Sequence, residues 1–169
     1  SAWEYTMSPI VLEDTVNGSL VSVPPTHELA SLLQDELASA TGLAARWAAD
    51  RVQGNRHGLS LWSVPFVTEA GSKGFFTLCW SANLQTQLSA KLGAAAARPE
   101  FMGSLLRAVV GRWANQLALQ GQSAVRLLPS PDSICAPEAE EKPSYRSHAA
   151  LLIDGHVLEL NFLLEQAQA

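Results

Sequence analysis

The 169-residue sequence predicts an α+β fold in which six strands form a mostly antiparallel sheet and long helices lie together on one face. Two observations support this. Apolar residues recur at helical spacing over 26–41 and 99–120. Each of these segments is followed by three shorter runs that favour strands. The sequence therefore predicts a duplicated unit of one helix and three strands, with a short helix between the copies.

The first predicted helix spans 26–41, after two prolines, with Thr26 as its N-cap and Gly42 as its stop. Its leucines recur at a spacing that places them on one buried stripe. They are Leu29, Leu32, Leu33 and Leu37.

Three strands are expected after this helix, and a short helix at 82–92 then ends at Gly93. The strands are placed at 43–52, 59–67 and 74–80. Pro65 cannot donate a ladder hydrogen bond, so it indicates an edge position or a bulge in the second strand.

The long helix at 99–120 is framed by Pro99 in its first turn and Gly121 past its end. Its apolar stripe comprises Phe101, Met102, Leu105, Leu106, Val109, Val110, Trp113 and Leu117. The opposite stripe comprises Ser104, Ala108, Gly111, Arg112 and Asn115. Small residues around one arginine and one asparagine allow another protein to approach closely. The alternative is a helix packed on both sides, within its own domain or in a homodimer.

The second set of strands is expected at 124–128, 145–153 and 156–164. Asp154-Gly155 joins the last two, and this dipeptide between alternating apolar runs is a strong hairpin signal. The proline-rich, acidic segment 130–144 is expected to be an exposed loop. Residues 1–25 form an N-terminal extension with one short strand, at 9–13 or 19–23, on the sheet edge, and residues 26–169 form a single domain.

Composition excludes several functional classes. The net charge is −5 and the 11 lysines and arginines are scattered, which argues against nucleic-acid binding. No apolar run is long enough to span a membrane, so we expect a cytoplasmic protein. No nucleophile, nucleotide or metal motif occurs, and we expect no cofactor and no metal site. Cys79 is expected to be buried and inert, and Cys135 accessible.

One stretch of the chain carries a family likeness. The string GFFTL at 74–78 is followed by leucines up to Leu92-Gly93, then by a long helix that holds Trp113-Ala-Asn115, and finally by a strand hairpin. This pattern, over residues 26–165, resembles the CheC/CheX chemotaxis phosphatase superfamily, whose fold the middle domain of the flagellar switch protein FliM shares. The resemblance implies the same α+β fold and a response-regulator receiver domain or a motility protein as partner.

The resemblance implies a Glu-x-x-Asn motif, with which members of that family dephosphorylate the aspartyl phosphate of a receiver domain. The Asn orients the attacking water, and the Glu pairs with a lysine of the receiver. Asn115 matches the Asn, but Arg112 stands where the Glu is expected, and a guanidinium repels a lysine. A second copy falls on the first helix, where Glu36 supplies the acid and Ser39 replaces the amide.

The sequence therefore favours a degenerate member of this group, a non-catalytic domain in chemotaxis or motility signalling that docks a receiver domain or a motor component. Its expected binding residues are Ser104, Gly111, Arg112, Asn115 and Glu36. One alternative is an active phosphatase in which Asn115 is catalytic. Another is an unrelated α+β subunit of a secretion or chaperone-like system.

Overall fold

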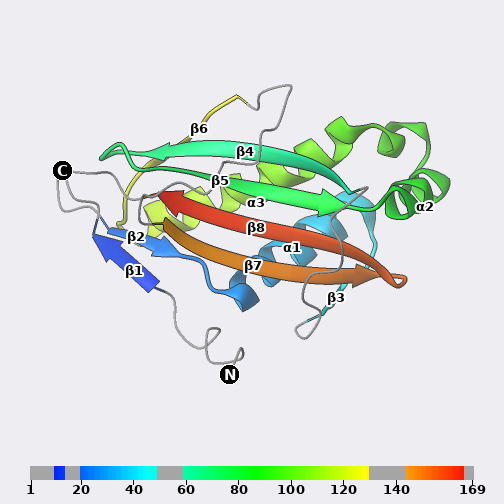
Figure 1. Cartoon of the computed structure of the whole chain (residues 1–169), viewed down its shortest axis with the longest axis horizontal. Helices are drawn as coiled ribbons and strands as arrows, with labels where there is room; N and C mark the ends of the chain where they lie inside the picture. Colours follow the sequence, from blue (N-terminus) through cyan, green and yellow to red (C-terminus); the bar gives the residue numbers. More distant parts are fainter. Residues whose placement is uncertain (1–9, 14–19, 49–58, 130–143, 166–169) are drawn as a thin grey trace.

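The computed structural model describes residues 10–13, 20–48, 59–129 and 144–165. A layer of helices lies behind one curved sheet (Figure 1). The helical elements are α1 (Thr26–Thr41), α2 (Ala82–Leu92), the 3₁₀ turn η2 (Ala94–Ala97) and α3 (Pro99–Leu119). The strands are β1 (Ile10–Glu13), β2 (Leu20–Val23), β3 (Arg46–Trp47), β4 (Ser60–Thr68), β5 (Lys73–Trp80), β6 (Val125–Leu127), β7 (Ser144–Ile153) and β8 (His156–Glu165).

The main sheet has six strands in the order β3-β7-β8-β5-β4-β6, and every neighbouring pair is antiparallel. Exchanging β3, β4 and β5 with β6, β7 and β8 reverses this order and leaves it otherwise unchanged. The predicted duplication of one helix and three strands is therefore confirmed in the topology, with β5 and β8 at the centre. α1 packs on β7 and β8, and α3 packs on β4 and β5.

Four aromatic rings fill the space between α3 and the sheet. Trp113 of α3 lies with its ring centroid 5.0, 5.2 and 5.4 Å from those of Phe66, Phe76 and Phe162. All four side chains are at most 1% exposed. Phe101, at the start of the predicted stripe, is only partly buried against this core. The apolar stripe of α3 therefore faces the strands, as the helical spacing predicts.

A glycine sets how closely α3 approaches β4. A Cβ atom on Gly103 would lie 2.5 Å from Cε2 of Trp62, so the indole occupies the space that a side chain would need. Gly111, two turns later, has no atom within 4 Å of such a Cβ. One glycine of α3 therefore serves packing, and the other leaves the outer side of the helix open.

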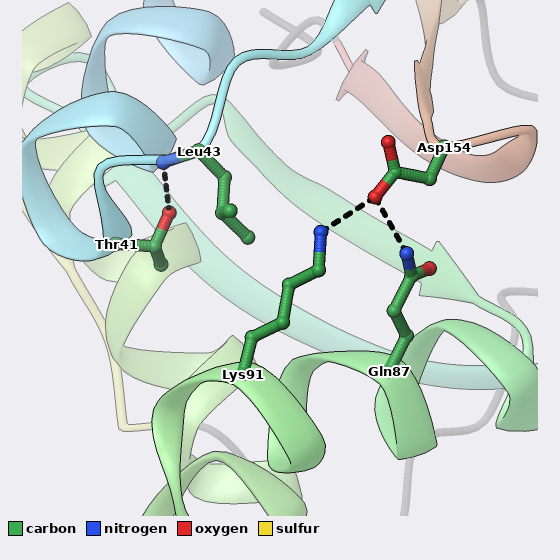
Figure 2. A network of polar contacts seen from close by, with 5 residues as sticks. All are labelled: Thr41, Leu43, Gln87, Lys91 and Asp154. Atoms are coloured by element: carbon green, nitrogen blue, oxygen red, sulfur yellow. Dashed lines mark hydrogen bonds and ion pairs between the residues drawn. The ribbon is translucent and has the colours of Figure 1, made fainter.

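The hairpin between β7 and β8 turns at Asp154 and Gly155, whose φ angles are 49° and 83°, as a two-residue turn of type I′ requires. Asp154 accepts hydrogen bonds from Lys91 Nζ at 2.7 Å and Gln87 Nε2 at 2.6 Å (Figure 2). The bond from Lys91 lowers the pKa of the Asp154 carboxyl. These contacts fasten α2 to the tip of the hairpin.

The N-terminal part differs from the sequence prediction. Both candidate segments form strands, β1 and β2, and these pair with each other in a separate two-stranded sheet instead of extending the main one. Val21 and Val23 of β2 are 1% and 3% exposed and belong to the hydrophobic core. The segment that follows α3 also holds β2, because Ser123 N donates to Leu20 O at 2.8 Å and Ser22 N donates to Gln122 Oε1 at 2.7 Å.

Smaller predictions meet mixed outcomes. Thr26 is the first helical residue of α1, and Pro25 takes the N-cap position without a side-chain hydrogen bond, so the N-cap prediction is wrong. The predicted edge position or bulge at Pro65 is wrong, because β4 lies between β5 and β6 and its register with β5 is continuous through Pro65. The sheet tolerates the proline there, and its carbonyl accepts a hydrogen bond from Leu128 N. Cys79 is buried, as expected.

Several predictions fall on other parts of the chain. Cys135, residues 49–52 of the first predicted strand and nearly all of the acidic loop at 130–144 lie outside the described residues. Within the described residues, no helix combines the length and apolar character needed to cross a bilayer.

Candidate functional site

The outward surface of α1 and α3, here termed the α1–α3 face, carries the side chains that the sequence singled out. Its residues are Asp35, Glu36 and Ser39 of α1, and Ser104, Ala108, Gly111, Arg112 and Asn115 of α3. The two helices pack side by side and run in opposite directions along the sheet (Figure 1). The face is therefore a two-helix surface on the side away from the strands.

The sequence of α3 explains why this side is open. Its buried residues are Met102, Gly103, Leu105, Leu106, Val109, Val110, Trp113 and Leu117. Ser104, Ala108 and Asn115, on the opposite stripe, are exposed. Within the part of the chain that the structure describes, nothing covers this stripe, and α3 packs there on one side only. A contact with a second copy of the chain stays a prediction.

Arg112 joins the two helices. Its Nη1 lies 3.4 Å from Oε1 of Glu36, and its Nη2 lies 3.5 Å from Oδ2 of Asp35. The side chains of Asp35, Arg112 and Glu36 are 59%, 39% and 20% exposed. The helical spacing predicts that Arg112 and Asn115 lie exposed on the same face. Asn115 is exposed, whereas Arg112 is half-buried because its guanidinium lies between two carboxylates of α1.

The two incomplete motif copies meet at this bridge. The family resemblance places Glu36 and Arg112 at equivalent positions of the two helices, and the structure brings these two side chains together. Because the helices run in opposite directions, Asn115 lies about one turn to one side of the bridge and Ser39 about one turn to the other. The face therefore carries an acid and an amide, but from different helices.

The charge of the bridge alters one inference from the sequence. An isolated Arg112 would repel a lysine of a docking partner, but two carboxylates accompany this guanidinium. With both acids ionised, the three side chains carry a net charge of about −1. Each partly exposed pair contributes roughly 0.2–1 kcal/mol and is weakened by salt. Arg112 is therefore not an uncompensated positive charge on the face.

Asp35 is the site residue that the sequence reasoning missed. It precedes Glu36 and matches no position of the motif, so the resemblance gives it no role. Its pairing with Arg112 depends on how two helices far apart in the sequence cross each other. The one available signal was the presence of two adjacent acids on one helix and of an arginine among small residues on the other.

Metal-binding clusters and pockets are the other kinds of site that the part of the chain described by the structure could offer. No cluster of histidine, cysteine and acidic side chains within the described ranges has the geometry to hold a metal ion. A pocket of about 360 Å³ lies elsewhere, beside the β7–β8 hairpin, where its lining includes Arg46, Leu152 and Asp154.

Comparisons with known proteins support the fold. No protein-family model matches the chain, and no curated protein sequence matches it. A solved CheX–CheY–BeF₃–Mg complex from Borrelia burgdorferi contains a chain that is 12% identical with a TM-score of 0.61, over 81% of this chain and 95% of that one. A CheC-like chemotactic protein from Shewanella oneidensis is 10% identical with a TM-score of 0.58, over 81% and 95%.

The middle domain of FliM from H. pylori is also similar, at 10% identity and a TM-score of 0.51, over 81% of this chain and 85% of that one. The chain therefore has the fold that CheX, CheC-like proteins and the FliM middle domain share, as the sequence resemblance implied.

Proposed function

We propose that this chain is a non-catalytic docking domain of the CheC/CheX type in bacterial chemotaxis or motility signalling, and that its α1–α3 face binds a response-regulator receiver domain or a motor component in the cytoplasm. The observation that carries the proposal is Arg112. It occupies the position of the motif acid on α3 and forms ion pairs with Asp35 and Glu36 of the same chain.

Hydrolysis of an acyl phosphate by this family's chemistry needs an amide and an acid that are positioned together, because misplacement by about 1 Å can cost 100-fold in rate. Here α3 offers Asn115 without an acid one turn before it, and α1 offers Glu36 without an amide at Ser39. Glu36 also forms an ion pair with Arg112. Neither helix alone therefore presents the pair of groups that the chemistry needs.

The comparisons support the nature of the partner. The CheX of Borrelia burgdorferi was crystallised together with CheY, and the FliM middle domain has the same fold as this chain. The open stripe of Ser104, Ala108, Gly111 and Asn115 offers the close approach that a flat protein interface requires. Of these partners we favour a receiver domain, and a homodimer is an alternative use of the same surface.

The second candidate is an active phosphatase of receiver aspartyl phosphate. It is favoured by the placement of Glu36 next to Arg112, because an acid from α1 and Asn115 from α3 then share one face. The fold itself argues against the third candidate, an unrelated secretion or chaperone-like subunit.

Docking is tested by titrating fluorescently labelled receiver domains, with and without the phosphate analogue BeF₃⁻, with the purified protein. We expect one or more receivers to bind, and we expect Asn115→Ala to weaken that binding while changing stability by less than about 0.5 kcal/mol. Asn83→Ala makes the same substitution at an exposed position of α2 and serves as the control. If Asn115→Ala and Asn83→Ala bind receivers equally well, docking does not use the α1–α3 face.

A further inference from the structure

The three side chains of the Asp35–Arg112–Glu36 bridge are exposed to solvent to different extents, and this difference affects how a partner can contact the face. Asp35 has the most exposed side chain of the three, at 59%, and Glu36 the least, at 20%. The two ion-pair distances of 3.4 and 3.5 Å exceed those of ordinary charge-assisted hydrogen bonds, about 2.7–2.9 Å. The guanidinium is thus held by charge, and a competing cation can displace it.

The net charge of the bridge determines which kind of partner side chain can compete with Arg112. Two carboxylates and one guanidinium leave about one negative charge in excess, and the most accessible of the three groups is the carboxylate of Asp35. An approaching lysine or arginine gains attraction from Asp35, whereas an approaching anion meets a carboxylate on either side of Arg112. A basic side chain of the partner is therefore the better match.

We infer that Arg112 acts as an internal competitor that weakens docking: it occupies Asp35 and Glu36, and a basic side chain of the partner displaces it to pair with Asp35. This inference rests on the proposed function. Release of Arg112 frees a second carboxylate for the partner and breaks the cross-link between α1 and α3. The bridge thus lowers the affinity of the face for its partner, and Asp35 becomes a specificity-determining residue.

The test compares receiver binding by the parent protein, Arg112→Gln, Asp35→Asn and the double variant. Arg112→Gln should tighten binding about two- to fivefold at low ionic strength, because it removes competition worth one or two partly exposed ion pairs. Asp35→Asn should weaken binding, and the double variant should lose most of the gain. The gain should also shrink as salt is raised.

Arg107→Gln is the matched control. Arg107 is exposed on the same helix, and its Nη1 donates to the backbone carbonyl of Leu128 at 3.3 Å, so the variant removes the same charge without touching the bridge. Circular dichroism of each variant verifies that the fold is kept. We expect Arg107→Gln to change receiver affinity clearly less than Arg112→Gln does.

Three outcomes overturn the inference. Weaker binding by Arg112→Gln would mean that the guanidinium itself contacts an anionic group of the partner. Unchanged binding, or an equal gain in Arg107→Gln, would mean that the bridge does not compete with docking. If neither the parent nor any variant binds a receiver, the proposed function fails and this inference fails with it. In the first two outcomes, receiver docking itself stands.

Discussion

Replacement of Trp113 by alanine tests whether the buried stripe of α3 holds the helices to the sheet. Trp113 is 1% exposed, and its ring lies 5.0–5.4 Å from three other aromatic rings. Truncating a buried tryptophan costs about 3–5 kcal/mol, and lost aromatic pairs add about 0.5–1.5 kcal/mol each. Because these costs overlap, we expect Trp113→Ala to lose about 4–5 kcal/mol, in the upper part of the range.

Urea unfolding monitored by circular dichroism measures this loss, and thermal unfolding gives a second estimate. A loss of about 4 kcal/mol corresponds to a fall in Tm of roughly 8–16 °C for a domain of this size. Trp47→Ala is the control, because Trp47 lies on the short edge strand β3 and is 36% exposed. If Trp113→Ala does not fold, Trp113→Phe, which keeps a ring in the cluster, should lose about half as much. Equal stability of the Trp113 and Trp47 variants would refute the packing described here.

Two further predictions concern the glycines of α3 and the contact between Asp154 and α2. Gly103→Ala should lower the free energy of unfolding by about 1–3 kcal/mol because its methyl group meets Trp62, whereas Gly111→Ala should raise it by up to about 1 kcal/mol. Urea unfolding of both variants measures these changes, and equal effects would contradict the prediction. Asp154→Asn should destabilise the protein at neutral pH. Because Lys91 lowers the folded-state pKa of Asp154, its contribution is present above the ordinary value of 3.8 and is lost as pH falls through the lowered value. The difference between parent and variant should therefore shrink in acid, and a difference independent of pH would contradict the role of the charge.

The main architecture was predictable because its signals are local and strong. The apolar stripe of α3 repeats over several turns, Pro99 and Gly121 mark its ends, and Asp154-Gly155 has few conformations besides a hairpin turn. The pairing of β1 with β2 was missed because four-residue strands carry little periodicity. The packing of α1 and α3 on one face of the sheet was predictable because both helices have an apolar stripe that must be buried.

The site was predictable only in part. Asn115 and Arg112 stand out in the sequence because small residues surround them on a helix face that would ordinarily carry lysine and glutamate. The bridge from Arg112 to Asp35 and Glu36 depends on the packing and opposite directions of α1 and α3, which no local pattern encodes. Its consequence, an arginine whose charge is compensated within the chain, therefore emerges only from the assembled fold.

The most direct test of the non-catalytic docking proposal is the rate at which a phosphorylated receiver domain loses its phosphate in the presence of the parent protein and of Arg112→Glu. Arg112→Glu restores the motif acid one turn before Asn115, where a glutamate and an asparagine are neighbours on one helix surface. We expect the parent to leave the receiver's own rate unchanged and Arg112→Glu to increase it. A parent protein that already accelerates dephosphorylation well above that rate, together with an inert Arg112→Glu, would contradict the proposal and establish the phosphatase alternative.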